Sequence, residues 1–149
     1  IADQVVVMQD GEVVQIGTPV ELFERPQHTF VGHFIGSPGM NLLPCAVKNG
    51  QPVYSGGSIE TTHKVDLKDP AAKLEIGIRP EFISFAEAGV AVSIEKISDA
   101  GRFNIVETRH GEDVIKLLVA DGSPVPSENA FLKFDPDHTH VYANNWMVS

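Results

Sequence analysis

Two short runs of β-branched residues open the chain on either side of a turn dipeptide. Residues 5–8 read Val-Val-Val-Met, residues 13–16 read Val-Val-Gln-Ile, and Asp10-Gly11 lies between them. An Asp-Gly pair in this setting favours a tight hairpin, because both central residues of that turn need a positive φ. The pattern therefore predicts a β-hairpin at the start of the chain.

A short helix is predicted directly after the hairpin. Thr18 is a good N-cap residue, Pro19 suits the first helical position, and Glu21 completes a capping box. This helix should end at about Arg25, because Pro26 disfavours a helical conformation in the residue before it.

A second short helix is expected over residues 29–35, where apolar residues recur at helical spacing and Gly36 is placed to terminate the helix. The apolar stripe consists of Phe30, Val31, Phe34 and Ile35. Such a stripe is either core or a docking face. Both readings stay open, because the segment before residue 40 is too short to close a core alone.

Gly36-Ser37-Pro38-Gly39 is the clearest break in the chain, and no convincing helical period follows it. Short runs separated by Gly, Pro, Asp or Asn predict strands at 42–48, 51–54, 58–62, 74–79, 90–98, 102–108, 113–119, 130–134 and 139–143. Many short, closely spaced strands indicate a small barrel or sandwich. We therefore expect a mainly β fold, preceded by the hairpin and the two helices.

Composition narrows the classes of protein that remain. The chain has 149 residues, of which 42% are hydrophobic, and a net charge of −9. Such a charge repels a nucleic-acid backbone, so nucleic acid is not an expected partner. A single cysteine, Cys45, excludes an internal disulfide and fits a reducing cytoplasm, where we expect a buried, inert thiol. We also expect no membrane-spanning segment and no signal peptide. The first residue, Ile1, suggests a chain cut from a longer one.

Motifs for nucleotide hydrolysis and for several other activities are missing. No glycine is followed by lysine, so the G-x-x-x-x-G-K-[ST] phosphate loop is absent, as are G-x-G-x-x-G and G-x-S-x-G. We therefore expect no catalytic residue, no bound cofactor and no hydrolysis of ATP by this chain alone.

Two polar clusters remain as candidates. Asp135, Asp137, His138 and His140 could share a metal if both histidines lie on one face of a strand. The favoured interpretation is a Pro-containing turn that leads into a final strand with the histidines on its exposed side, so we expect no metal. Arg79-Pro80-Glu81 ends an apolar run and suits either an anion or acid–base site or, more commonly, a salt bridge that holds a turn.

The longest motifs resemble a known family. Residues 2–11 (ADQVVVMQDG) and 14–19 (VQIGTP) look like the last hairpin of ABC-transporter ATP-binding subunits. Residues 22–26 (LFERP) and 30–44 (FVGHFIGSPGMNLLP) resemble a narrower set, the ATPases of carbohydrate importers of the maltose, glycerol-3-phosphate and multiple-sugar type. Residues 76–81 (IGIRPE) are similar to the G-I-R-P-E signature of the C-terminal regulatory domain of that set, the transport-associated OB fold.

The resemblance implies three parts. Residues 1–35 would be the end of a nucleotide-binding domain, and 42–149 the OB-fold regulatory domain. The implied hinge between them consists of Gly36, Ser37, Pro38, Gly39, Met40 and Asn41. The implied signature turn is Arg79, Pro80 and Glu81, although Phe82 stands where many members carry a polar residue.

The resemblance also implies partners and a location. Regulatory domains of this family pair across a two-fold axis, so we expect a homodimer. The full-length parent would bind ATP and Mg²⁺, work with transmembrane permease subunits on the cytoplasmic face of the membrane and, as in some members, receive a regulatory protein. The alternatives that remain are a free-standing OB-like barrel that binds a small ligand and the metalloenzyme built on Asp135, Asp137, His138 and His140.

Overall fold

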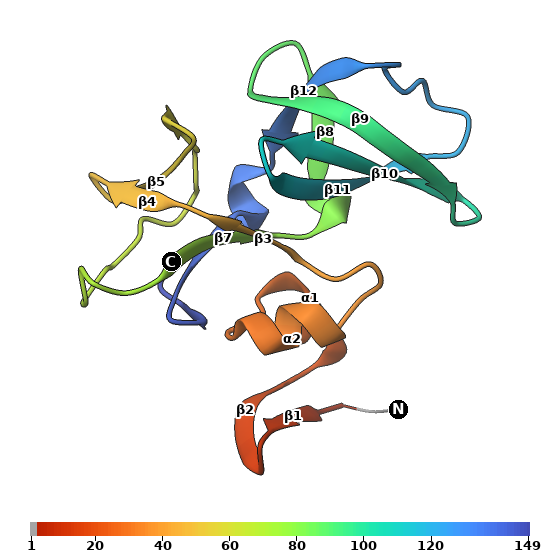
Figure 1. Ribbon diagram of the computed structural model, residues 1–149. Helices are drawn as coiled ribbons and strands as arrows, with labels where there is room; N and C mark the ends of the chain where they lie inside the picture. The colour runs from red at the N-terminus through yellow and green to blue at the C-terminus, as the bar shows by residue number, and fades with distance from the viewer. Residues whose placement is uncertain (1–2) are drawn as a thin grey trace.

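The predicted hairpin opens the computed structural model, which describes residues 3–149 (Figure 1). Strand β1 (Val5–Gln9) pairs antiparallel with β2 (Glu12–Gly17). Asp10 and Gly11 form the turn with φ values of 52° and 80°, as this type of turn requires. The prediction is confirmed. Ile1 and Ala2, which belong to the implied 1–35 segment, lie outside the described residues.

Both predicted helices are also present. Helix α1 (Pro19–Glu24) begins with the complete capping box, in which the Glu21 backbone NH donates to the Thr18 hydroxyl and the Thr18 NH donates to the Glu21 carboxylate. Helix α2 (Thr29–Phe34) is capped by His28, whose Nδ1 accepts from the Phe30 NH at 3.0 Å. Local capping chemistry therefore fixes where both helices start.

Five strands form the largest sheet, in the order β11-β10-β9-β12-β8. Their bounds are β8 (Ile83–Ala86), β9 (Val90–Asp99), β10 (Phe103–His110), β11 (Asp113–Ala120) and β12 (Asn129–Phe134). All of their pairings are antiparallel. Because β11 also lies against β8 and the 3₁₀ turn η1 (Pro80–Phe82), the sheet curls toward a small barrel. The expected mainly β fold is confirmed.

There are two smaller sheets: the one that contains β3 and β7 lies between the barrel and the helices, whereas β4 and β5 extend to one side (Figure 1). One has the order β14-β13-β7-β3, and the other has the order β4-β5-β6. Their bounds are β3 (Asn41–Pro44), β4 (Ala46–Lys48), β5 (Gln51–Tyr54), β6 (Gly57–Ser58), β7 (Leu74–Ile78), β13 (His140–Ala143) and β14 (Trp146–Met147). A second 3₁₀ turn, η2 (Pro136–His138), leads into β13.

Several predicted strand bounds are wrong. The expected strand 42–48 is interrupted at Cys45, whose NH donates to the Leu74 carbonyl, so its two halves join different sheets. The expected strand 58–62 is reduced to β6. Strands β8 and β14 were not expected, because four and two residues give too little periodicity to detect.

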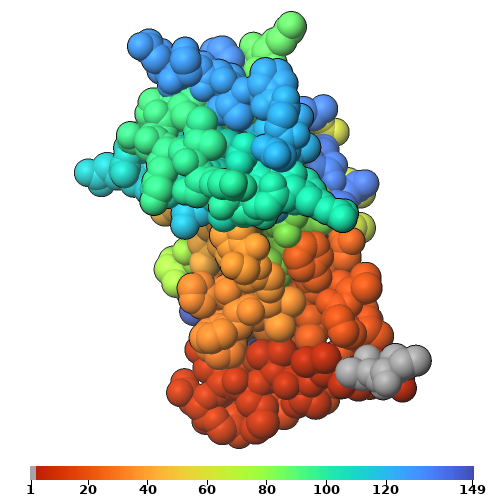
Figure 2. Space-filling view, turned by 90° about the vertical axis from the view of Figure 1, so that its right-hand side faces the viewer, coloured from red at the N-terminus to blue at the C-terminus, as the bar shows by residue number. Residues whose placement is uncertain are grey.

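The buried apolar residues fall into two separate clusters. The larger cluster spans the sheets and contains Leu43, Tyr54, Ile76, Ile78, Ile83, Val90, Val92, Val106, Ile115, Leu117, Leu132 and Phe134. The smaller cluster consists of Val7, Leu22 and Val31. Figure 2 shows the hairpin and helices as a red and orange lobe at one end of the molecule. No helix in residues 3–149 is long and apolar enough to cross a membrane.

Candidate functional site

The candidate site is the seam where residues 23–41 meet the turn after β7 and strands β13 and β14. Arg79 follows β7 and is 2% exposed. Its Nε donates to the Phe23 carbonyl at 2.9 Å, and its guanidinium carbon lies 4.3 Å from the centre of the Phe23 ring. Arg79 therefore attaches the end of α1 to the β domain, which comprises residues 41–149, through a hydrogen bond and a cation–π contact.

The turn formed by Arg79, Pro80 and Glu81 does not contain the expected salt bridge. Glu81 is exposed, and no ion pair joins it to Arg79 in the described part of the chain. The expected salt bridge is therefore wrong, because Arg79 turns inward under Phe23. Its two Nη atoms are buried and have no hydrogen-bond partner among residues 3–149. Burial lowers the pKa of the Arg79 guanidinium, while the nearby Glu81 and Tyr142 act in the opposite direction.

The first part of the implied hinge fits closely around Arg79. Gly36 has a φ of +97°, and a Cβ atom there would lie 2.6 Å from the Arg79 Nη1 atom. A Cβ at Gly39 would lie 2.9 Å from the His33 carbonyl oxygen. These two glycines therefore allow the loop to pass between α2 and the β domain without a clash.

The last two residues of the implied hinge are held in place. Met40 is buried, and its NH donates to the Gly32 carbonyl at 3.0 Å. The Asn41 amide nitrogen donates to the carbonyls of Ile78 and Lys116, and its oxygen accepts from the Lys116 NH. Asn41 is thus a fixed member of β3, and any flexibility of the implied hinge has to reside in residues 36–39.

The apolar stripe of α2 is divided between core and surface. Val31 is fully buried, Phe30 and Ile35 are half-buried, and Phe34 is 63% exposed. The rings of Phe30 and Phe34 lie 4.5 Å apart. Val31 therefore belongs to the core, and only Phe34 and part of Phe30 remain available for docking.

His138 joins the two sides of the seam. Its Nε2 lies 2.6 Å from a Glu24 carboxylate oxygen, its Nδ1 lies 2.5 Å from an Asp135 oxygen, and its ring stacks on Phe82 at 3.6 Å. Burial acts to lower the pKa of His138, but the hydrogen bonds to Asp135 and Glu24 outweigh it and raise the pKa above its usual value. His138 is therefore a bridge between α1 and the β domain.

The geometry of the polar residues at 135–140 contradicts their interpretation as a metal site. Residues 136–138 form a 3₁₀ turn rather than a strand, so His138 and His140 do not share a strand face. His140 is 3% exposed, which also contradicts the alternative of exposed histidines, and burial lowers its pKa to about 4. No group of three or more metal-binding side chains occurs in residues 3–149.

Strand β14 and its pairing with β13 complete the seam; the sequence predicted β13 as a strand over residues 139–143 but missed β14. The Tyr142 hydroxyl donates to the Pro26 carbonyl at 2.6 Å, the Met147 NH donates to the Gln27 carbonyl, and the Trp146 ring makes an edge contact with His28. The available signal was Asn144-Asn145, a turn dipeptide in which both residues have positive φ.

Cys45 takes no part in the seam. Its thiol is free and half-buried. Burial, and secondarily the charge of Glu75, raises its pKa to about 11. A thiol of this kind is protonated at neutral pH and unreactive, as expected from its apolar surroundings.

The comparisons with known proteins agree with this architecture. Residues 36–83, which include the connecting loop and the Arg79 turn, match the family described as the MalK OB fold domain. The chain is also similar to two proteins named sn-glycerol-3-phosphate import ATP-binding protein UgpC. The protein from Escherichia coli strain K12 is 35% identical over 148 residues, and that from Shigella boydii serotype 4 is 36% identical.

The matched region covers 95% of this chain and 42% of each of these two relatives. The chain therefore spans about two fifths of their length. It contains an OB fold domain of the MalK type and is homologous to the C-terminal part of importer ATP-binding subunits. The resemblance read from its motifs is confirmed.

Proposed function

We propose that this chain is the regulatory and dimerising part of the ATP-binding subunit of an ABC importer for sugars or polyols. The proposal is supported by the similarity of nearly the whole chain to proteins that are named as import ATP-binding proteins. Because the chain has no Gly-Lys phosphate loop, we propose that it does not bind ATP by itself. In the full-length parent, other residues would bind and hydrolyse ATP with Mg²⁺, and the chain itself would not.

The structural observation that carries the proposal, by linking this chain to a nucleotide-binding domain, is the apolar outer face of the β1–β2 hairpin. Val6 pairs with Ile16 and Met8 pairs with Val13, so these four side chains lie on one face. Each is between 52% and 56% exposed. The opposite face contributes Val7 to the cluster with Leu22 and Val31.

A hairpin that is apolar on both faces is typical of a strand pair buried between two layers. The two helices supply one layer, and the second has to come from outside residues 3–35. We propose that the rest of a nucleotide-binding domain supplies it, so that residues 1–35 are the end of that domain. A continuous exposed face of this kind marks an interaction surface.

The seam would then transmit motion between the catalytic and regulatory parts. The loop 36–39 and the Arg79 clamp on Phe23 are the points where a movement of α1 reaches the β domain. The close approach of Gly36 to the Arg79 Nη1 atom supports this role, because a displaced loop has to move Arg79 with it.

The test of this coupling uses the full-length parent with its permease. Gly36→Ala would push the loop away from Arg79, and Gly39→Pro would stiffen it. Both should lower transport-stimulated ATP hydrolysis while leaving the basal rate in place. Gly122→Ala is the matched control, because Gly122 also has positive φ but nothing lies within 4 Å of its Cβ position. Equal stimulation in all three variants would refute the coupling.

The proposed partners are a second copy of the chain, the permease subunits and a regulatory protein, with the complex at the cytoplasmic face of the membrane. Phe34 is the residue of the α2 stripe best placed for docking, because it is 63% exposed. Light scattering over a concentration series should show a dimer of the full-length subunit. A subunit that stays monomeric with permease and ATP present would refute the dimerising role alone.

A further inference from the structure

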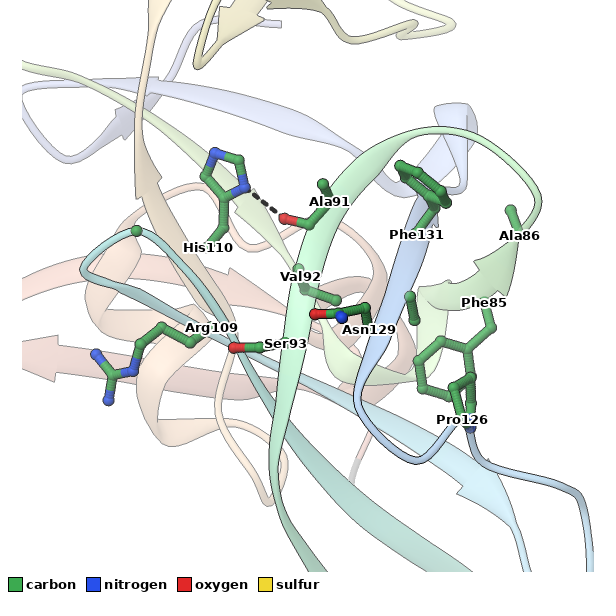
Figure 3. A pocket seen from close by; sticks show the side chains of 12 residues that line it. Phe85, Ala86, Ala91, Val92, Ser93, Arg109, His110, Pro126, Asn129 and Phe131 are labelled. Carbon is green, nitrogen blue, oxygen red and sulfur yellow. Dashed lines mark hydrogen bonds between the residues drawn. The ribbon is translucent and has the colours of Figure 1, made fainter.

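A hollow of about 490 Å³ lies on the outer face of the five-stranded sheet, away from the seam (Figure 3). Its floor consists of small side chains on β8 and β9, namely Ala86, Ala91 and Ser93. Phe131 pairs with Ala91 on one side and with Ala86 on the other. A large ring between two small neighbours leaves space beside it, and this register explains the concave surface.

The sheet also opens at this place. Strand β9 pairs with β10 only as far as Ser93, which lies opposite Arg109. Beyond that pair, residues 90–92 of β9 remain paired with β12 alone. His110 extends past the end of the β9–β10 ladder, and its ring covers the exposed backbone of Ala91 (Figure 3).

Three polar side chains line the hollow with unused hydrogen-bonding capacity. His110 Nδ1 lies 2.5 Å from the Ala91 carbonyl oxygen, which can only accept, so Nδ1 donates this hydrogen bond and Nε2 remains available to a ligand. The Asn129 amide and the Ser93 hydroxyl make no hydrogen bond with any other described residue. Together they offer both donors and acceptors to a ligand.

The electrostatics of the hollow favour a neutral ligand. Arg109 is the one charged side chain that lines it in the described part of the chain, and its Nε is already paired with Glu95 at 2.9 Å. The net charge of −9 adds a repulsive field for anions. The Phe131 ring, 42% exposed, presents a flat face with negative electrostatic character.

We propose that this hollow binds a neutral saccharide of two or three rings. The C–H face of one sugar ring packs on Phe131, while Asn129 and Ser93 hydrogen-bond to its hydroxyl groups. A second hollow of about 280 Å³ shares Ala91 and His110 with the first, so an elongated ligand can continue past His110. Volumes of this size are typical of small-molecule sites. This site is independent of the proposed role in ATP-driven import.

Titration of the ¹⁵N-labelled 149-residue chain with maltotriose and with cellotriose tests the site. We expect at least one of them to give saturable shifts centred on the amides of Ala91, Ser93 and Asn129, with a Kd of about 1 mM. Phe131→Ala should weaken binding about tenfold. Phe103→Ala, the matched control on β10, replaces a phenylalanine that is 46% exposed and should leave the Kd unchanged.

Three results would overturn the proposal. One is the absence of saturable shifts with both trisaccharides up to about 20 mM. Another is an equal loss of affinity in Phe131→Ala and Phe103→Ala, because binding would then not involve the hollow. The third is tighter binding of glucose 6-phosphate than of either neutral trisaccharide, since this would show an anion site instead.

Discussion

The N-terminal lobe and the β domain bury their apolar residues to very different extents. In the lobe, residues 3–35, three residues form the buried cluster, while six large apolar side chains are exposed: Val6, Met8, Val13, Ile16, Val20 and Phe34. The β domain has twelve residues in its main cluster. The difference indicates that the β domain stabilises itself, whereas the lobe depends on the seam and, as we propose, on a further domain.

The largest expected effect comes from a matched pair of core truncations. Leu117 in the barrel and Leu22 in the lobe are both fully buried. We expect Leu117→Ala to lower the free energy of global unfolding by about 2–5 kcal/mol in urea titrations. Leu22→Ala should instead speed amide exchange in residues 5–35 and change the urea midpoint of the barrel less. Equal losses of global stability would show that the two regions unfold as one unit.

The second largest loss of stability is expected when the contact between Arg79 and Phe23 is removed. Arg79→Met removes the donor to the Phe23 carbonyl and should destabilise the docked lobe by about 1–3 kcal/mol. The measurement is hydrogen exchange, which should accelerate in residues 18–35 while β9–β11 keep their protection. Arg109→Met is the control, because Arg109 belongs to an exposed ion pair worth about 0–1 kcal/mol. Protection that is unchanged in Arg79→Met would contradict the clamp.

A smaller change in the free energy of unfolding is expected when the pH is changed. Because the pKa of His138 in the folded chain is raised above 6.5, its contribution is fully present below pH 6.5 and is lost as pH rises through the folded-state pKa. His140 acts in the opposite sense, since its pKa falls to about 4 and stability is lost as pH falls from 6.5 toward 4.

The variant His138→Gln separates the pH-dependent contribution of His138 from that of His140. It should be less stable than the wild type by about 0.5 kcal/mol near pH 5.5, and nearly equal to it at about pH 8.5. Urea titrations at both pH values provide the measurement. A difference that is the same at both pH values would show that His138 contributes through packing on Phe82 and not through its charge.

Local chemistry could be predicted from the sequence in detail, whereas contacts between distant segments could not. The Asp10-Gly11 turn and the Thr18 capping box follow from neighbouring residues, and both are present as expected. The inward position of Arg79 depends on Phe23, which is 56 residues away. No periodicity or spacing in the sequence encodes such a contact. The sequence therefore favours a salt bridge between Arg79 and the neighbouring Glu81.

The polar cluster before β13 shows the same limit. His138 and His140 are two positions apart in the sequence, and side chains at this spacing point to the same side only if the residues form a strand. Pro136 instead begins a 3₁₀ turn, and the Glu24 partner of His138 lies 114 residues away. The motifs, in contrast, identified the family, because they are runs of adjacent residues that a comparison can match directly.

The most direct test of the central claim compares one substitution in two contexts. Ile16 is 56% exposed in this chain, so Ile16→Asp should change the stability of the 149-residue chain by no more than about 0.5 kcal/mol. In the full-length subunit, the same change should abolish ATP hydrolysis or lower Tm by several degrees, whereas Glu12→Gln on the same strand should do neither. If Ile16→Asp leaves the full-length subunit as stable and active as the wild type, the hairpin face is not buried against a nucleotide-binding domain.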